Sequence, residues 1–488
     1  MAANLIDTDE TLSLSAPQPQ RSGGAWGIAW AHPEERVDIL AENSVTLGRS
    51  ERANIVLRGP RVSRCHATLE KGPAGFVVSD CGSKNGVFVN GEQFSVHALA
   101  PGDVLRVGDW IGVLCPLSPP QVESRLPLTE LGSGLLGGES LWHASQILRR
   151  AAPENVNVML VGETGTGKEL FARELHRRSG RSGKLVSVNC ATIPEQLAEA
   201  ELFGFRRGAF TGAHQDSLGH LRRAHRGTLF LDEVADLGSA VQVKMLRALE
   251  EHSVVPLGQS KSEEADARVV CAAQRPLHDY VELGRFRADL YARLGGVELF
   301  LAPLRQRREE IVPLFRRFLC AGAALDTVSF STDFVECLCL YDWPLNVRQL
   351  VQLAARTRAL HGPLLEAGTS LTSHHLPQEI VSGWPGVDSE AASSPPSAPA
   401  SSAPVSGAPA SSAPVSSAVP TGSSTLPPRA SDRPRDQLAE RLAQALHESQ
   451  GNVSLAARRV GISRARAYRL LKRLPELDPE ELRLKGLI

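Results

Sequence analysis

The chain has 488 residues, of which 42% are hydrophobic, so it is too long for one ordinary domain and has enough apolar content for two to four folded units. Its 53 basic and 54 acidic residues give a net charge of −1, which excludes a uniformly basic nucleic-acid-binding surface and leaves only local basic patches. The sequence holds no apolar stretch of about 20 residues and no secretory signal, so we expect a cytoplasmic protein that does not associate with membranes.

Eight cysteines are scattered along the chain without a zinc-binding spacing, which indicates reduced thiols. Cys337 and Cys339 are close enough to suggest a metal hook. No set of His or acidic partners lies nearby in the sequence, so we interpret both residues as part of a helix core.

The chain begins with a polar, aperiodic segment at residues 1–23, which is expected to be disordered. Residues 24–116 show short runs of alternating hydrophobicity separated by Gly, Asn, Asp and Pro, a pattern typical of an all-β sandwich. The runs are 45–47, 55–57, 67–69, 76–78 and 87–89.

Three motifs occur in order within this β pattern and together resemble the forkhead-associated (FHA) domain. They are Leu47-Gly48-Arg49-Ser50, Ser63-Arg64-Cys65-His66 and the stretch 80–91, which contains Lys84 and Asn85. The resemblance implies binding of phosphothreonine in a partner protein or a Ser/Thr kinase, through Arg49, Ser63, Arg64, Lys84 and Asn85. Arginine offers a charge-assisted fork for phosphate, and His66 is expected to support the loops. The alternative is a sandwich that has lost binding, because Gly and Asn also shape turns.

Residues 117–138 are rich in Pro, Ser and Gly and are predicted to be a linker. From residue 139 to 304, buried strand-like runs alternate with helical patterns, which predicts an α/β domain with a parallel sheet. The strand runs are 156–161, 185–188, 228–231 and 268–272, and the helices are 168–178 and 241–251.

A glycine-rich loop follows the first of these strands and precedes a helix, which is the context that distinguishes a P-loop from an ordinary turn. Its backbone N–H groups and the helix N-terminus suit phosphates, and its lysine reaches the β and γ oxygens of ATP. The loop and the residue after it are Gly162, Glu163, Thr164, Gly165, Thr166, Gly167, Lys168 and Glu169.

The strand at 228–231 ends in Asp232 and Glu233, at the sheet edge where doubly wound sheets bind ligands. After a P-loop, this pair is interpreted as a Walker B site. Asp232 suits a Mg²⁺ ion, and Glu233 suits polarising the attacking water.

A second glycine-rich string lies between the two nucleotide motifs, where glycines permit a sharp loop with an exposed tip. It comprises Gly208, Ala209, Phe210, Thr211, Gly212 and Ala213. This GAFTGA string resembles the signature loop of the sigma-54-dependent activators, the bacterial enhancer-binding proteins of the AAA+ class. The resemblance covers residues 134–380 and implies that the loop contacts sigma-54 RNA polymerase.

The same resemblance implies roles for single residues and a helical AAA+ lid at 305–380. Asn189 would contact Glu233, Arg287 and Arg293 would act on ATP held by a neighbouring subunit, and Arg348 would sense the γ-phosphate. It also implies a homo-oligomer, a hexamer. Gln274 stands where the family usually has Asn, and Leu345 replaces a usual Gly, which affects the expected rate and regulation of hydrolysis.

The composition then changes to a Ser/Ala/Pro-rich stretch at 387–435, which is predicted to be a disordered tether. Residues 436–475 recover helical periodicity and resemble a Fis-type helix-turn-helix that binds enhancer DNA, with residues 476–488 as a tail. The residues expected to cap the second helix or to face DNA are Ser463, Arg464, Arg466, Tyr468, Arg469 and Lys472.

The sequence thus predicts a multidomain, ATP-hydrolysing and Mg²⁺-dependent transcription activator with two-component-like signalling through the sandwich. Two rivals remain. One is a phosphothreonine-dependent scaffold without useful ATPase activity. The other is an AAA+ chaperone or protease motor, which the GAFTGA string and the helix-turn-helix both disfavour.

Overall fold

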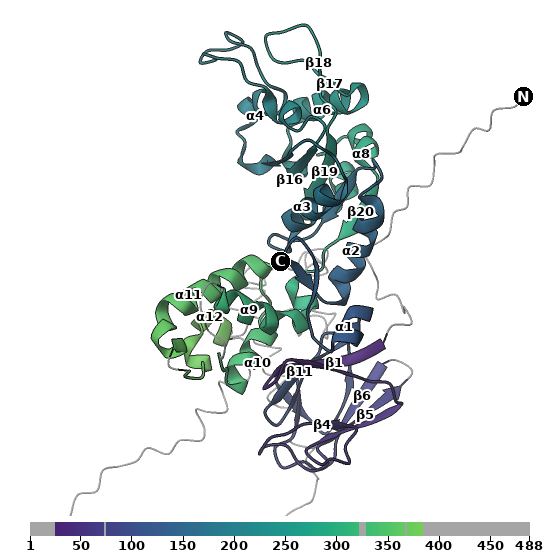
Figure 1. Ribbon diagram of the computed structural model, residues 1–488, viewed down its shortest axis with the longest axis vertical. Coiled ribbons are helices and arrows are strands. Elements are labelled where there is room, and N and C mark those ends of the chain that lie inside the picture. Colours follow the sequence, from purple (N-terminus) through teal and green to yellow (C-terminus); the bar gives the residue numbers. More distant parts are fainter. Residues whose placement is uncertain (1–24, 73–74, 322–327, 367, 383, 385–488) are drawn as a thin grey trace, which may run out of the picture. The chain divides into compact units, whose positions relative to one another are not determined.

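The computed structural model describes residues 25–72, 75–321, 328–366, 368–382 and 384, and these belong to one compact unit. They form a β-sandwich, a parallel α/β domain and a helical lid (Figure 1). None of the described helices combines the length and the apolar character that crossing a membrane requires.

Two sheets with shared apolar side chains between them make up the sandwich, which confirms the predicted all-β domain. Their strand orders are β2-β1-β11-β10-β7-β8 and β4-β3-β5-β6-β9. Trp30, Leu47 and Leu69 are fully buried between them. The strands are β1 (Ala25–His32), β2 (Arg36–Ile39), β3 (Ser44–Gly48), β4 (Ile55–Val56), β5 (Ala67–Gly72), β6 (Gly75–Asp80), β7 (Val87–Val89), β8 (Glu92–Phe94), β9 (Val96–Leu99), β10 (Val104–Val107) and β11 (Trp110–Leu117).

The predicted linker at 117–138 contains regular structure. Helix α1 (Pro119–Ser124) begins after Ser118, whose backbone N–H and hydroxyl both donate to the Gln121 side chain, and two prolines fit its first turn. Strands β12 (Thr129–Gly132) and β13 (Leu135–Gly137) then pair as a hairpin. Leu131 and Leu135 are buried against the α/β domain, so the hairpin packs on that domain.

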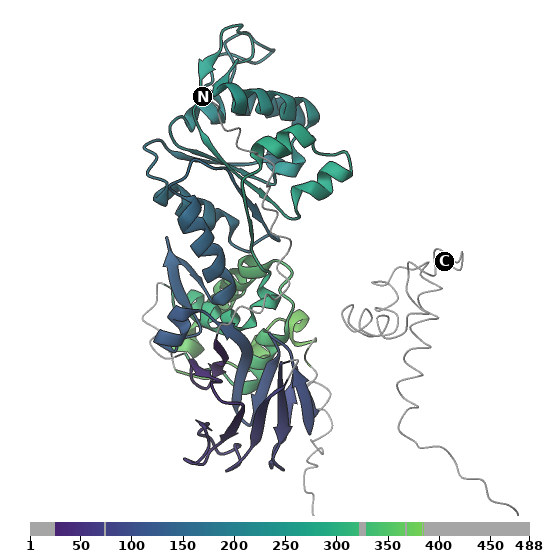
Figure 2. The same ribbon diagram turned by 90° about the vertical axis from the view of Figure 1, so that its right-hand side faces the viewer.

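The α/β domain has a five-stranded parallel sheet of order β15-β16-β19-β14-β20, as the alternating pattern predicted. Helices cover both of its faces (Figure 2). Its elements are α2 (Glu139–Ala151), β14 (Val158–Val161), α3 (Lys168–Arg178), β15 (Leu185–Asn189), η1 (Cys190–Thr192), α4 (Glu195–Phe203), α5 (Gly219–Arg223), β16 (Thr228–Asp232), η2 (Val234–Asp236), α6 (Ser239–Glu251), β17 (Ser253–Val254), β18 (Glu263–Glu264), β19 (Arg268–Ala273), α7 (Leu277–Glu282), α8 (Ala288–Leu294) and β20 (Val297–Phe300).

The lid is helical and packs around an aromatic cluster in which Phe315 and Phe330 both contact Phe334. Cys337 and Cys339 are buried in this core, as interpreted from the sequence, and no cluster of metal ligands occurs among the described residues. The lid elements are η3 (Leu304–Gln306), η4 (Arg308–Glu310), α9 (Ile311–Cys320), α10 (Thr332–Leu340), α11 (Asn346–Glu366), η5 (Ser373–His375) and α12 (Gln378–Val381).

The sandwich packs directly on the lid. Val104, Ile111 and Val113 of strands β10 and β11 belong to the same buried apolar cluster as the lid helices α9 and α10. Across this sandwich–lid interface, Arg106 Nε donates to Glu336 Oε1 at 3.0 Å. The sequence patterns did not predict this contact between the sandwich and the lid. The apolar residues on each side would equally be expected in the core of a domain that folds by itself.

Candidate functional site

The P-loop forms a tight cradle between strand β14 and helix α3. Gly165 and Gly167 have φ values of 80° and 110°, which favour glycine. Lys168 is 7% exposed, and its Nζ donates to the carbonyl oxygen of Gly162 at 2.8 Å. Burial lowers the pKa of Lys168, and the nearby Glu233 opposes that shift. The cradle thus points a desolvated ammonium group and the N-terminus of an 11-residue helix at one place, which fits a polyphosphate.

The two Walker B acids stand at the carboxyl end of β16, beside the P-loop. Glu233 adopts φ 52°, an unusual conformation for a non-glycine residue and one often found at functional sites. Its Oε1 lies 4.0 Å from the Lys168 ammonium. Glu233 therefore lies beside the Lys168 ammonium group, and Asp232 is close enough to influence that group electrostatically.

The partner of Glu233 differs from the expectation. Gln274 Nε2 donates to Glu233 Oε1 at 3.1 Å, whereas the Asn189 side chain accepts from the Ala191 N–H at 3.0 Å and caps η1. Asn189 pairs in register with Asp232, so it remains at the same sheet edge. The longer Gln274 side chain, at the position where Asn was expected, reaches the carboxylate.

The lid contributes two residues to the P-loop that sequence reasoning missed. Arg305 forms a two-pronged ion pair with Glu163, at 2.6 and 2.8 Å, and this hydrogen bonding lowers the pKa of the Glu163 carboxyl. The buried Asn346 donates to the Thr164 carbonyl oxygen at 3.0 Å. Arg305 lies in η3, and Asn346 is the first residue of α11, two positions before the predicted sensor Arg348. Neither side chain carries a nucleotide-binding signal in the sequence, so only the fold shows that both reach the P-loop.

The three arginines with predicted roles in ATP hydrolysis differ in their distance from the P-loop lysine: only Arg348 is close enough to influence Lys168 electrostatically. Arg348 lies in the lid within electrostatic range of Lys168. Arg287 pairs with Asp289, and Arg293 donates to the Leu249 carbonyl oxygen. Within the described chain, Arg287 and Arg293 form no hydrogen bond or ion pair with the P-loop or Glu233.

The GAFTGA string forms a loop that begins just after helix α4. Gly208 and Gly212 have φ values of 82° and 103°, and the Gly208 N–H donates to the Ala213 carbonyl oxygen at 2.9 Å. Phe210 is 38% exposed, although its ring contacts Phe205, and Thr211 is exposed. The loop thus presents its apolar and hydroxyl-bearing tip to the outside.

The base of this loop is fixed by charge. Arg206 forms ion pairs with Asp216, at 2.6 Å, and with Glu263, which also pairs with Arg222. Hydrogen bonding to Asp216 raises the pKa of Arg206. The base of the loop is thus anchored by ion pairs, while its tip is exposed.

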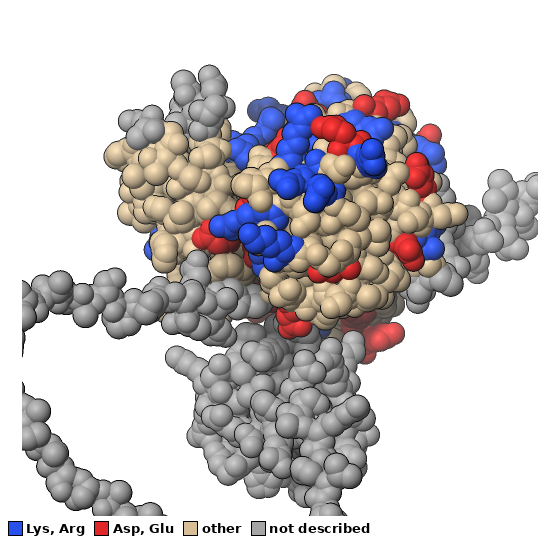
Figure 3. Space-filling model, turned by 90° about the horizontal axis from the view of Figure 1, so that it is seen from below, with Lys and Arg blue, Asp and Glu red and all other residues tan. Residues whose placement is uncertain are grey.

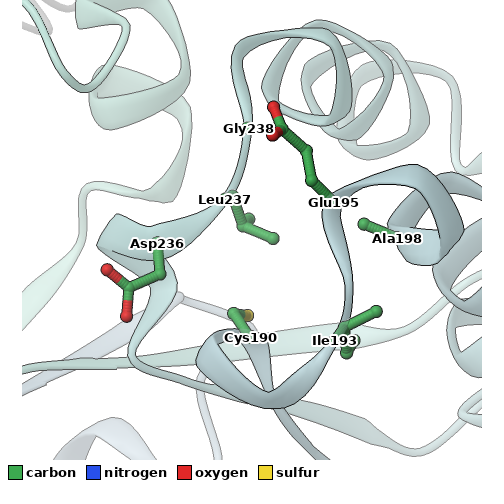
Figure 4. Close-up of a pocket in the computed structure, with 7 residues that line it drawn as sticks. All are labelled: Cys190, Ile193, Glu195, Ala198, Asp236, Leu237 and Gly238. Atoms are coloured by element: carbon green, nitrogen blue, oxygen red, sulfur yellow. The ribbon is translucent and has the colours of Figure 1, made fainter.

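A pocket of about 210 Å³ separates the segments that follow Asn189 and Glu233. Cys190, Ile193, Glu195 and Ala198 approach it from η1 and α4, and Asp236, Leu237 and Gly238 approach it from the side of η2 (Figure 4). Helix α4 leads from the end of β15, where Asn189 lies, toward the GAFTGA string, and the pocket borders the first part of this segment.

The predicted phosphopeptide residues meet on the loops at one end of the sandwich. The Lys84 N–H donates to Ser63 Oγ at 3.1 Å, and Asn85 Nδ2 donates to the Arg61 carbonyl oxygen at 2.7 Å. Arg49 and Arg64 are exposed beside them. The Arg49 backbone N–H donates to the Ser63 carbonyl oxygen at 3.0 Å, which brings the two loops together. His66 is fully buried, and its two ring nitrogens contact the Ser63 N–H and the Gly86 carbonyl oxygen, so it joins the loops. The predicted helix-turn-helix, with Ser463 and the basic residues after it, lies outside the described residues.

Three family models match separate parts of the chain. Residues 137–300 match the sigma-54 interaction domain, residues 45–108 match the FHA domain, and residues 305–392 match an AAA+ ATPase lid domain.

Similar proteins include known bacterial regulators. The pathogenicity locus probable regulatory protein HrpS of Pseudomonas syringae pv. syringae is 44% identical over 222 residues, which are 45% of this chain and 73% of that protein. The sigma54-dependent transcriptional activator SfnR of Pseudomonas putida is 44% identical over 225 residues, which are 45% of this chain and 60% of its own length. Among solved structures, NtrX from Brucella abortus in complex with ATP has 28% identity and a TM-score of 0.46, covering 73% of this chain and 72% of that chain.

Proposed function

The chain belongs to the sigma-54-dependent transcriptional regulators, and from this premise we propose that it is an ATP-hydrolysing activator that remodels sigma-54 RNA polymerase through its GAFTGA loop. The observation that carries the proposal is the placement of this loop. It is exposed at its tip, anchored at its base, and joined through α4 to the edge that holds the Walker B acids.

ATP is the substrate that fits the cradle. The backbone of Gly162 to Gly167 would hold its phosphates, with Lys168 against the β and γ oxygens and Asp232 toward a Mg²⁺ ion. When bound, the ion supplies charge neutralisation to the phosphates. Added bulk at Gly165 would come within 2.2 Å of the Leu345 carbonyl oxygen, so the cradle accepts only glycine there.

The hydrolysis step would depend on Glu233, which orients the attacking water and accepts its proton. Gln274 holds this carboxylate in its present position, and Asn189 stands one strand away as the predicted switch partner. Arg348 would sense the γ-phosphate from the lid.

An oligomeric ring, a hexamer by family likeness, would complete the site. Arg287 and Arg293 make no bond with the P-loop of their own subunit within the described chain, which suits action on ATP bound by a neighbour. Both side chains are accessible enough to be redirected by a partner subunit.

The FHA domain would sense phosphothreonine in a partner protein or a Ser/Thr kinase. Arg49, Ser63, Arg64, Lys84 and Asn85 offer guanidinium, hydroxyl, ammonium and amide groups on adjoining loops. The Asn85 carboxamide oxygen remains available for a peptide N–H while its nitrogen holds the loop.

Binding to enhancer DNA is assigned to residues 436–475. Arg464, Arg466, Arg469 and Lys472 would enter the major groove or contact phosphates, with Ser463 as the helix cap and Tyr468 beside them.

The decisive test is Thr211→Ala in transcription from a sigma-54 promoter with purified components. We expect loss of open-complex formation, while ATP hydrolysis and DNA binding stay near parental levels, because Thr211 is exposed and is not among the residues that bond to Lys168 in the described chain. Thr369→Ala removes the hydroxyl of another exposed threonine, in the lid, and serves as the matched control. Full activation by Thr211→Ala would show that the loop does not couple hydrolysis to the polymerase.

A further inference from the structure

The loops at the phosphopeptide end of the sandwich carry more positive charge than one phosphate needs. Segments 49–66 and 80–86 hold six Lys or Arg residues and two acidic residues. All six basic side chains belong to exposed residues, and Figure 3 shows Lys and Arg gathered on the molecule seen from below, where the sandwich lies in Figure 1. They are Arg49, Arg52, Arg58, Arg61, Arg64 and Lys84.

Arg58 and Arg61, which the predicted phosphate site leaves unused, stand on a fixed backbone. The Trp110 indole N–H donates to the Arg58 carbonyl oxygen at 2.8 Å. Asn85 donates to the Arg61 carbonyl oxygen at 2.7 Å. Because Asn85 is itself a predicted peptide-binding residue, Arg61 lies next to the path of a bound peptide, and Arg58 lies three residues before it.

Among the described residues, these two arginines have only weak ion-pair partners. Arg58 lies 3.5 Å from Glu51, and the two side chains are 83% and 78% exposed. Arg61 lies 3.5 Å from Asp109 and is 68% exposed. Ion pairs this exposed contribute little to stability, so both guanidinium groups are available to a ligand. In the described part of the chain, Arg52 and Arg64 form no ion pair at all.

We propose that the FHA domain selects phosphothreonine segments flanked by acidic side chains, with Arg58 and Arg61 as the specificity-determining residues. The inference rests on the proposed phosphothreonine sensing and adds the chemical class of the partner. A surplus of positive charge attracts a segment rich in Asp, Glu or further phosphates and disfavours one with basic flanks.

Three fluorescent peptides and the full-length chain test this selection by anisotropy. One peptide carries phosphothreonine between alanines, one carries it between aspartates, and one has the aspartates but an unphosphorylated threonine. The parent chain is expected to bind the aspartate-flanked phosphopeptide about tenfold more tightly than the alanine-flanked one, as several exposed charge pairs would give. Higher salt should reduce this ratio.

The variant Arg58→Ala/Arg61→Ala should lose most of that ratio while keeping its affinity for the alanine-flanked phosphopeptide. The matched control, Arg149→Ala/Arg150→Ala, removes two exposed arginines from helix α2 and should keep the ratio. Arg49→Ala should lose both phosphopeptides, which separates phosphate binding from flank selection.

The outcomes distinguish selection of acidic flanks from phosphothreonine sensing. Equal affinity of the parent for both phosphopeptides, or an unchanged ratio in the Arg58→Ala/Arg61→Ala variant, overturns the acidic preference and leaves phosphothreonine sensing intact. Failure to bind either phosphopeptide, or equal binding of the unphosphorylated aspartate peptide, overturns phosphothreonine sensing and the preference with it.

Discussion

Removing the Glu336 carboxylate at the sandwich–lid interface should lower the free energy of unfolding by more than the loss of an exposed ion pair would. The Glu336 side chain is 2% exposed and accepts two hydrogen bonds, from Arg106 Nε at 3.0 Å and from Trp384 Nε1 at 2.9 Å. Breaking a buried pair from one side costs about 3–5 kcal/mol. Arg106 is 24% exposed and stacks over Phe88 at 3.6 Å, so it keeps some solvation and packing when its partner is lost. We therefore expect Glu336→Ala to cost about 2–3 kcal/mol.

A double-mutant cycle isolates the pair from the other effects of each substitution. Glu336→Ala, Arg106→Ala and the double variant are unfolded in urea, with tryptophan fluorescence as the signal, and the coupling free energy is expected to be about 1–2 kcal/mol. Arg173 and Glu169 form the control cycle, since their 2.7 Å pair on helix α3 is 57% exposed on both sides and should couple by about 0.3–0.5 kcal/mol. Equal coupling in the two cycles would refute a buried ion pair between the sandwich and the lid.

Three further predictions concern other parts of the chain. Lys168→Ala should lose ATP binding, whereas Glu233→Gln should bind ATP and lose turnover by on the order of 100-fold or more, measured by nucleotide binding and phosphate release. Turnover at the parental level in either variant would contradict the role assigned to that residue. Burial and the adjacent Glu310 raise the pKa of Glu309 to about 8 from its usual 4.5, so its contribution to stability is present below pH 4.5 and lost as pH rises through 8. Glu309→Gln should therefore be more stable than the parent at pH 8.5 by on the order of a few kcal/mol and lose this advantage near pH 5, and identical melting temperatures at both pH values would contradict the assignment. Arg464→Ala/Arg469→Ala should weaken DNA binding and reduce its salt slope by about two units, and an unchanged slope would remove these residues from the phosphate contacts.

Much of the fold followed from local patterns. The glycine-rich loop at 162–167 was predicted to connect a buried strand to a helix, and helix α3 begins at Lys168 as expected. The alternating runs of the sandwich and the buried strands of the parallel sheet were likewise found where periodicity placed them. Such features are encoded within ten or so neighbouring residues, where sequence reading is strongest.

Contacts between distant segments could not be predicted in this way. Arg305 and Glu163 are 142 positions apart in the sequence, and Gln274 and Glu233 are 41 positions apart. Neither pair therefore produces a local pattern of hydrophobicity or charge that a sequence analysis could detect. The segment at 117–138 was predicted as a linker because its Pro and Gly content resembles one. Its prolines instead begin a helix, and Leu131 is buried against a domain that only the tertiary fold supplies.

The sandwich and the lid share one buried apolar cluster. Arg305 and Asn346 connect the lid to the phosphate cradle, and Arg106 and Glu336 connect the sandwich to the lid. The lid therefore contacts both parts of the chain, and any coupling between a ligand on the sandwich and a nucleotide in the cradle must be reciprocal. Whatever factor a bound phosphopeptide applies to the affinity for nucleotide, the nucleotide applies to the affinity for the phosphopeptide.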